Sequence, residues 1–436
     1  MKAPVYWLGL VLCCSACTAP SLRYKNEVNK LVVAEQFTQA AQQVEKHRRK
    51  SYAKKDFALA YLDEAALLHD AGQTTQSDAL LALAQARTEE LYTKRVGAET
   101  ARLLVNDLTA AYYPAPYEQA LTYFYRAMNF LERQDWAGAA VEARRAAFYL
   151  DHLRGEKQHG YNDDPFVQYF TALIFEAIHQ PDDARISRTN ALNAYAKWGS
   201  DWKISAPVFS IPENANELGE VIIFHYNGLL PLKKTQTMQL AWSRMHGILA
   251  TYNEDRSALT PQVQNALNAG FMGNSITVAY PVLEKQSYYI TSSAIEINGE
   301  QYPLQKVTNL AALSKQDLDE KMPGILFRVV ARGVAKQVAA AQARQLATGS
   351  SKDDTMGDVA GWFVQVLGAA TERADTRQWF TLPAEIHMQR LFLPPSVQNI
   401  KMLFKDGNGN IVGEHIFENV TIERGKRVFL HYRTAR

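Results

Sequence analysis

The sequence predicts an α+β protein, with paired helices in the N-terminal half and a mixed, β-rich C-terminal half. Two observations lead to this prediction. Between residues 26 and 200, apolar side chains recur at three- and four-residue intervals, which places them on one face of a helix. Beyond residue 200, apolar runs become short and alternate with turn residues, a pattern that is typical of strands.

The chain begins with a pattern typical of an exported protein. Lys2 precedes a short apolar run, which ends in small residues just before Cys17. A helix that spans a bilayer needs about 20 apolar residues, so this shorter run is predicted to be a cleaved signal at residues 1–16. The alternative is an ordinary secretory signal with incidental cysteines.

The residues Ser15, Ala16 and Cys17 resemble the cleavage site of bacterial lipoprotein signals, although Cys14 stands where leucine is usual. The resemblance implies a lipid on Cys17, with residues 17–25 as anchor and linker. Because Thr18 rather than aspartate follows, it also implies the outer membrane, facing the periplasm. Several acyl chains on one cysteine meet the requirement of two signals for stable membrane anchoring.

Cysteine content and charge narrow the classes of function. The three cysteines stand at positions 13, 14 and 17, so a mature chain would retain only Cys17 and could form no internal disulfide or cysteine metal site. Hydrophobic residues make up 47% and charged residues 21%, which is ordinary for a globular protein. The formal net charge is +2 without an extended basic patch, so no nucleic acid is expected as a partner.

The helical half, residues 26–200, is predicted to contain helical hairpins. The clearest one has an apolar stripe over residues 117–131, a short turn and a second, alanine-rich stripe over residues 136–150. Gly72 is predicted to end one helix in the left-handed conformation, and Pro181 to begin another.

These hairpins resemble tetratricopeptide repeats, although their turns near residues 37, 77, 136 and 183 are spaced unevenly, whereas such repeats hold about 34 residues. The resemblance implies a solenoid whose concave face binds peptides or proteins. A generic helical bundle is the alternative.

The C-terminal half, residues 201–436, is predicted to be a mixed α/β domain with a C-terminal β-sheet, built as a sandwich or barrel. A helical insertion is expected at about residues 305–380, with Ser314 and Asp317 as its capping pair. The apolar stretch 357–370 is too short to span a bilayer, so it is a core helix or a surface that touches a membrane or partner. Strands are predicted at residues 221–224, 288–297, 301–304, 386–393, 399–404, 411–416 and 427–432.

Four segments, residues 117–145, 219–222, 328–336 and 374–383, together resemble a family of poorly characterised bacterial outer-membrane lipoproteins with tetratricopeptide-like repeats. The family has no agreed activity. Its members are encoded near small lipoproteins that activate penicillin-binding proteins, which implies a role in the cell envelope. The candidate partners are an unidentified envelope protein and peptidoglycan or peptidoglycan synthases.

A search for catalytic motifs gives no positive result. The sequence contains no His-Glu-x-x-His, Gly-x-Ser-x-Gly or phosphate-binding glycine loop, and its histidines lack metal-ligand spacing. Residues 406–410 mimic the start of a calcium loop, but Phe417 occupies the position of the bidentate glutamate, so a hairpin turn is expected. No catalytic residue, cofactor or metal is therefore predicted.

Two groups of residues are candidates for contact with a partner. The first group consists of four tyrosines, which are expected at the surface. For Tyr117, core packing is an equal alternative. Asp375, Arg377 and Trp379 could bind a sugar or peptide, but a turn in which Arg377 pairs with Asp375 while Trp379 packs in the core is favoured. The four tyrosines are Tyr112, Tyr113, Tyr117 and Tyr125.

The sequence thus predicts a non-enzymatic periplasmic scaffold that recruits a protein partner in assembly or maintenance of the cell envelope. One alternative is an accessory protein or enzyme that acts on peptidoglycan or a surface polysaccharide. Another is a component of a secretion or surface-assembly machine.

Overall fold

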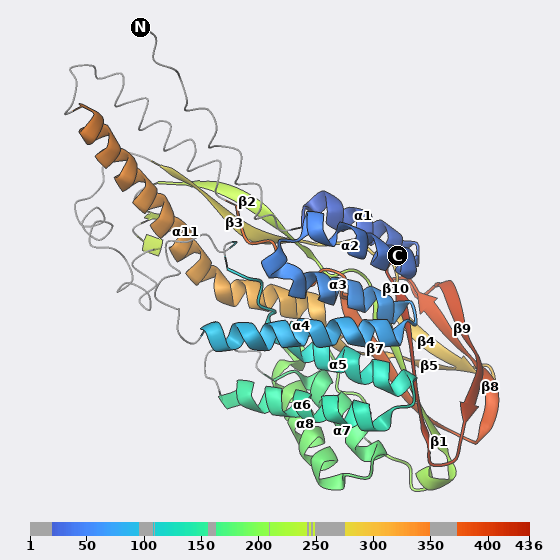
Figure 1. Cartoon of the computed structure of the whole chain (residues 1–436). Coiled ribbons are helices and arrows are strands. Elements are labelled where there is room, and N and C mark those ends of the chain that lie inside the picture. The colour runs from blue at the N-terminus through green and yellow to red at the C-terminus, as the bar shows by residue number, and fades with distance from the viewer. Residues whose placement is uncertain are drawn as a thin grey trace.

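The computed structural model describes residues 20–95, 108, 110–155, 163–208, 210–241, 244–245, 247–248, 275–348 and 373–436. It shows an α+β fold, with helices in the N-terminal half and sheets in the C-terminal half (Figure 1). Cys17 and the apolar stretch 357–370 lie outside the described residues. Within the described part of the chain, no helix has both the length and the apolar character needed to cross a bilayer.

The N-terminal helices form the four predicted hairpins, and each helix also contacts the next one along the chain. Hairpins arise here because each apolar stripe is buried only when a neighbouring helix covers it. The helices are α1 (Leu22–Val33), α2 (Phe37–Ser51), α3 (Phe57–Asp70), α4 (Thr74–Arg95), α5 (Pro116–Glu132), α6 (Trp136–Gly155), α7 (Pro165–Ala177) and α8 (Pro181–Trp202).

Local sequence signals set the ends of these helices. Gly72 follows α3 with φ +72°, the left-handed conformation that glycine adopts without steric cost. Asp164 precedes α7, and its carboxylate accepts hydrogen bonds from the backbone N–H groups of Phe166 and Val167. Pro181 occupies the first turn of α8, where a helix needs no N–H donor. The predictions for Gly72 and Pro181 are confirmed.

The strands form two four-stranded sheets and a two-stranded ribbon. The central sheet has the order β10-β1-β7-β6, with β1 parallel to β10, and the outer sheet has the order β5-β4-β8-β9. The ribbon pairs β2 with β3. The strands are β1 (Gly219–Asn227), β2 (Leu232–Leu240), β3 (Ile276–Glu284), β4 (Ser292–Ile297), β5 (Glu300–Pro303), β6 (Gln305–Asn309), β7 (Glu385–Leu393), β8 (Ser396–Lys405), β9 (Ile411–Ile422) and β10 (Arg427–Thr434).

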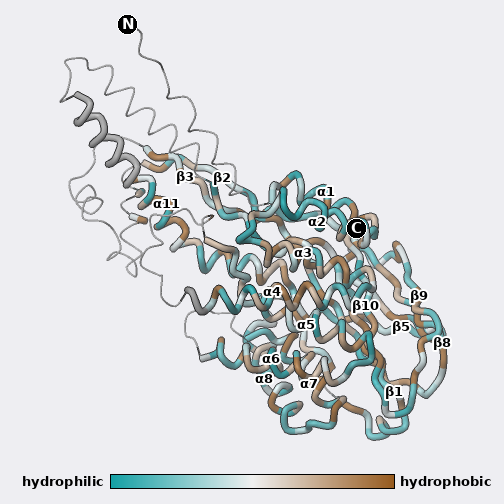
Figure 2. The backbone as a smooth tube through the Cα atoms, viewed as in Figure 1, coloured by the Kyte–Doolittle hydropathy of each residue, from teal (hydrophilic) through white to brown (hydrophobic). Residues whose placement is uncertain are grey.

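The central sheet lies between the helices and the outer sheet. Alternate residues of a strand point to opposite faces, so Ile222 and Phe224 of β1 pack with the helices, while Val221 and Ile223 pack with the outer sheet. Strand β1 is therefore buried along its whole length. Helices α3 and α7 are brown along much of their length, whereas α1 and α2 are largely teal (Figure 2).

Helix α11 (Leu310–Thr348) and the β2–β3 ribbon project from the layered body as an arm (Figure 1). The arm has a small core of its own, in which Ile276 and Val278 of β3 pack with Phe327 and Val330 of α11. The helix runs through Pro323 without ending.

The predicted helical insertion at residues 305–380 is wrong at both ends. Residues 305–309 form β6, because Val307 and its neighbours complete the central sheet. The helix then begins before Ser314 and Asp317, and Asn309 caps it by accepting a hydrogen bond from the N–H of Ala312 at 3.0 Å. Residues 373–379 contain no helix.

The hairpin turn predicted at residues 406–410 is confirmed, and a second tight turn joins β4 to β5. The β4–β5 turn has φ +53° at Asn298 and φ +85° at Gly299, as the tight turn favoured by Asn-Gly requires. In the β8–β9 turn, Asp406 accepts hydrogen bonds from the backbone N–H groups of Asn408 and Asn410, each at 2.9 Å. Its carboxylate thus stabilises a turn, in agreement with the prediction.

Candidate functional site

The predicted cluster of Asp375, Arg377 and Trp379 is a buried structural element. The guanidinium of Arg377 donates to both carboxylate oxygens of Asp375, at 2.9 and 2.7 Å, and to Asp56 at 2.7 Å. Its Nη1 also donates to the carbonyl of Ala110 at 2.7 Å. Trp379 is fully buried. The favoured interpretation, a turn with Trp379 in the core, is confirmed.

The segment that contains this cluster, residues 373–384, crosses the helices that were expected to form an open groove. Lys25 of α1 donates to a backbone carbonyl of this segment at 2.7 Å. Asp63 of α3 and Glu118 of α5 accept hydrogen bonds from its backbone N–H groups, at 3.0 and 2.9 Å. All three side chains are buried, and burial lowers the pKa of Lys25 to about 8.

The chain therefore covers its own helices with the crossing segment and the central sheet. A free concave face, which the resemblance to tetratricopeptide repeats implied, is not present on α1, α3 and α5. A partner must contact another surface.

The expectation of surface tyrosines is wrong for Tyr112 and Tyr125, which are buried, and for Tyr117 the alternative of core packing is confirmed. Tyr112 donates its hydroxyl hydrogen to Glu118, and the rings of Tyr125 and Trp379 lie 5.6 Å apart. Burial raises the pKa of each of the three hydroxyls. Tyr113 is half-buried. Tyr117 and Tyr125 pack in the interior because the apolar stripe of α5 faces the covered side of the helices.

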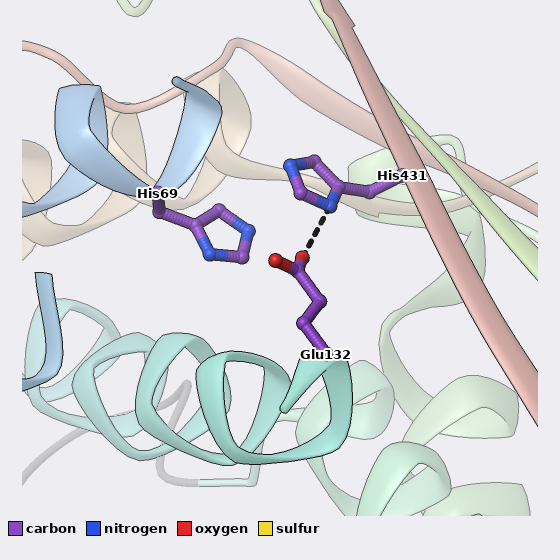
Figure 3. Close-up of side chains that lie close together, drawn as sticks. All are labelled: His69, Glu132 and His431. Carbon is purple, nitrogen blue, oxygen red and sulfur yellow. Dashed lines mark ion pairs between the residues drawn. The ribbon is translucent and has the colours of Figure 1, made fainter. Parts of the chain in front are cut away.

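Three side chains from distant parts of the chain meet where the helices cover the central sheet. His69 comes from α3, Glu132 from the last residue of α5 and His431 from β10, and the carboxylate lies beside both imidazoles (Figure 3). Nδ1 of His431 is 2.7 Å from a carboxylate oxygen of Glu132. The two imidazole rings stack, with centroids 4.2 Å apart and an interplanar angle of 15°.

A chain of hydrogen bonds assigns the tautomer of His69. Ser77 donates to the carbonyl of Ala65 at 2.8 Å, and Asn129 donates its amide hydrogen to Ser77 at 2.9 Å. The amide oxygen of Asn129 then faces Nδ1 of His69 at 2.8 Å, so this nitrogen carries the proton. The other nitrogen, Nε2, faces the hydroxyl of Tyr226 at 3.4 Å.

Two imidazoles and a carboxylate are a donor set that zinc favours, and their ligand atoms all lie within 4.8 Å of one another. The stacking does not fit a shared metal ion, however. An imidazole binds a metal through a lone pair in the plane of its ring. Because the two rings are stacked, their lone pairs lie in nearly parallel planes and do not point toward a common ion. One ring would have to rotate before both could bind one ion. The observed geometry suits a shared proton instead.

Electrostatics favour one charged histidine in this cluster. Burial lowers the pKa of His69 to about 4, with the nearby His431 adding to the effect. Burial also opposes charge on His431, but the hydrogen bond and charge of Glu132 outweigh it and raise the pKa of His431. The same contact lowers the pKa of Glu132 despite its burial. The two shifts together favour a neutral His69 beside a charged His431.

The best candidate for a binding site is an open groove of about 740 Å³ between β9 and β10. These strands follow each other in the chain but belong to different sheets, so they diverge after the turn that joins them. One wall consists of consecutive β9 residues, from His415 to Thr421. The other consists of residues of β10 and Gln134 of the α5–α6 turn.

Aromatic rings give the β9 wall of the groove an apolar surface. The ring of His415 stacks on Tyr432 at 3.7 Å, and Phe417 meets His415 edge to face at 4.7 Å. The His69–Glu132–His431 cluster lies directly behind the opposite wall, since Leu430 lines the groove and the next residue, His431, points toward the helices.

Comparison of the chain with protein-family models, with curated proteins and with solved structures found no match in any of the three. The candidate sites therefore rest on the chain's own residues. Neither the groove nor the histidine cluster has a local signal in the sequence, because both are formed by residues that only the folded chain brings together.

Proposed function

We propose that this protein is a non-enzymatic scaffold that binds a protein partner in the groove between β9 and β10. The observation that carries the proposal is the groove itself, an open space between two sheet edges with an aromatic wall. By contrast, the polar cluster of Asp375 and Arg377 is engaged inside the fold.

We further propose that a lipid on Cys17 holds the scaffold at the outer membrane, facing the periplasm. Ser21 caps α1 only four residues later, and an extended chain spans at most about 3.5 Å per residue. The tether from Cys17 would thus reach about 14 Å, so α1 would start near the membrane surface. The hairpins of α1 to α8, each packed on the next, support a tetratricopeptide-like array.

Affinity purification of the full-length protein from crosslinked cells tests the proposal. We expect one defined envelope protein to co-purify with the unaltered chain and to be lost, by tenfold or more, with Cys17→Ala. The matched control is Val141→Lys on the exposed face of α6, which should leave the yield unchanged. The absence of any protein beyond bulk outer-membrane proteins would contradict the scaffold function.

A further inference from the structure

We propose that the partner enters the groove as a single extended strand that hydrogen-bonds to the free edge of β9. This inference rests on the proposed scaffold function and specifies how the partner binds. Addition of a strand to an exposed sheet edge is an established mode of peptide recognition, in which backbone groups supply affinity and alternate side chains supply specificity.

The free edge of β9 faces the groove with its backbone. Among the described strands, β9 pairs only with β8, so its other edge has no strand partner. An edge strand presents a row of N–H and C=O groups that can pair with another chain. Consecutive residues of β9, rather than every second one, line the groove, as expected if the edge itself forms the wall.

Strand β9 lacks the protective side chains that are usual at an exposed edge. Edges are commonly guarded by lysine, proline, a bulge or short length. Residues 411–417 contain no lysine, arginine or proline, and they expose Ile411, Val412 and Ile416. The register with β8 shifts at both ends of this stretch, at Val412 and at Asn419, where φ is +53°. The regularly paired part of the edge is therefore Gly413 to Phe417.

Other edges of the described sheets carry such protection. In the ribbon, β2 contains Lys233 and Lys234, and β3 contains Pro281. In the outer sheet, β5 is only 4 residues long and ends at Pro303. The edge of β6 is covered, because the N–H of Ser205 donates to this strand at 3.0 Å. The remaining edge, β10, contains Arg427 and Arg433, so β9 differs from the other edges of the described sheets in being long and free of lysine, arginine and proline.

The charges of the groove favour a basic residue on the incoming strand. Arg427 pairs with Glu220 at 2.5 Å and with Glu176 at 2.9 Å, and Lys426 pairs with Glu423. Among the charged residues that line the groove in the described part of the chain, this leaves Glu418 uncompensated. We therefore expect apolar side chains at alternate positions and a lysine or arginine near Glu418.

A single strand fits better than the edge of a second copy of this chain. Stacked sheets lie about 10 Å apart, so the edge of a second copy would bring two sheet layers to the groove. A peptide strand brings only one layer. The wall of β10 and Gln134 stands opposite β9, so a ligand in the groove lies between two walls.

The test is selection of peptides from a random dodecapeptide display library on the purified full-length protein in detergent. We expect peptides with alternating apolar residues and a basic residue. Ile416→Lys should weaken their binding tenfold or more, whereas Val141→Lys should not change it. Both positions are exposed, 42% and 45%, so both variants should keep the thermal unfolding temperature of the unaltered protein.

N-methylation of the selected peptide gives a readout specific for strand pairing. Methylating every second amide, on the side that faces β9, should reduce affinity tenfold or more, and methylating the intervening amides should have little effect. The proposal is overturned if no peptide is selected, if both methylation patterns act equally, or if Ile416→Lys binds normally. It is also overturned if sedimentation shows a dimer that Ile416→Lys dissolves. If the partner still co-purifies from cells with the Ile416→Lys variant, the proposed scaffold function stands. Only the proposal that the partner binds as a strand at β9 is then refuted.

Discussion

At the scale of single residues, the two stacked histidines respond to pH in opposite directions. His431 has a raised pKa, so it contributes stability below its unfolded value of about 6.5, and this contribution is lost as the pH rises through the folded pKa. His69 has a pKa of about 4, so the unfolded chain binds the proton first and stability falls as the pH drops from about 6.5 toward 4. Near pH 6.5 the two contributions change with pH in opposite directions and partly offset each other.

His431→Gln removes the first of these effects and weakens the second, because His431 adds to the lowering of the His69 pKa. We expect the difference in urea midpoint between the unaltered protein and this variant to grow as the pH falls from 8 to 6.5, because the Glu132–His431 ion pair then forms fully. His152→Gln, on the exposed end of α6, is the matched control and should show no such change. Equal differences at both pH values would refute the charged pair.

At the scale of elements, the fold depends on a close approach between the two sheets where β1 begins. A Cβ atom on Gly219 would lie 2.4 Å from Cγ2 of Ile422 and 2.6 Å from the carbonyl oxygen of Glu423. Glycine at this position lets the end of β9 pass over the start of β1. This crossing determines where β9 leaves the outer sheet. It therefore also determines the position of the base of the groove.

Gly219→Ala should destabilise the protein by about 1–3 kcal/mol, the usual cost of overpacking. Gly155→Ala is the matched control, because no atom lies within 4 Å of its added Cβ. Urea titration followed by circular dichroism measures both. Equal stability of the two variants would contradict the claim that the two sheets are packed too closely at Gly219 to admit a Cβ atom.

Most regular elements with a clear buried face were predictable from the sequence, but strands β2 and β6 were missed. The hairpin of α5 and α6 shows a clear apolar stripe, because its residues pack on one side only. Strand β2 was missed because most of its residues are polar and its ribbon is partly exposed. Strand β6 was missed because its five residues run directly into α11.

At the scale of the whole molecule, one core joins the helices to the central sheet. Phe124 of α5, Phe170 of α7 and Phe224 of β1 lie in mutual ring contact across this boundary. The sequence predicted two successive halves, but it held no signal for which face of the helices the sheet would cover. That choice depends on contacts between residues more than 50 positions apart, as for Phe170 and Phe224.

The coverage of the helices moves the expected binding surface to the opposite side of the central sheet. Trp379 and Tyr125, which were candidates for partner contact, became core residues through that packing. The groove between β9 and β10 remained open, because these consecutive strands joined different sheets.

Photo-crosslinking in living cells tests the central claim, partner binding at the β9 edge, most directly. The full-length chain would carry benzoylphenylalanine at Ile416 in the groove or at Phe148, which is 78% exposed on α6. We predict one discrete adduct from position 416, mapped by mass spectrometry to an extended apolar segment of one envelope protein, and none from position 148. Adducts of equal yield at both positions, or at position 148 alone, would contradict the account.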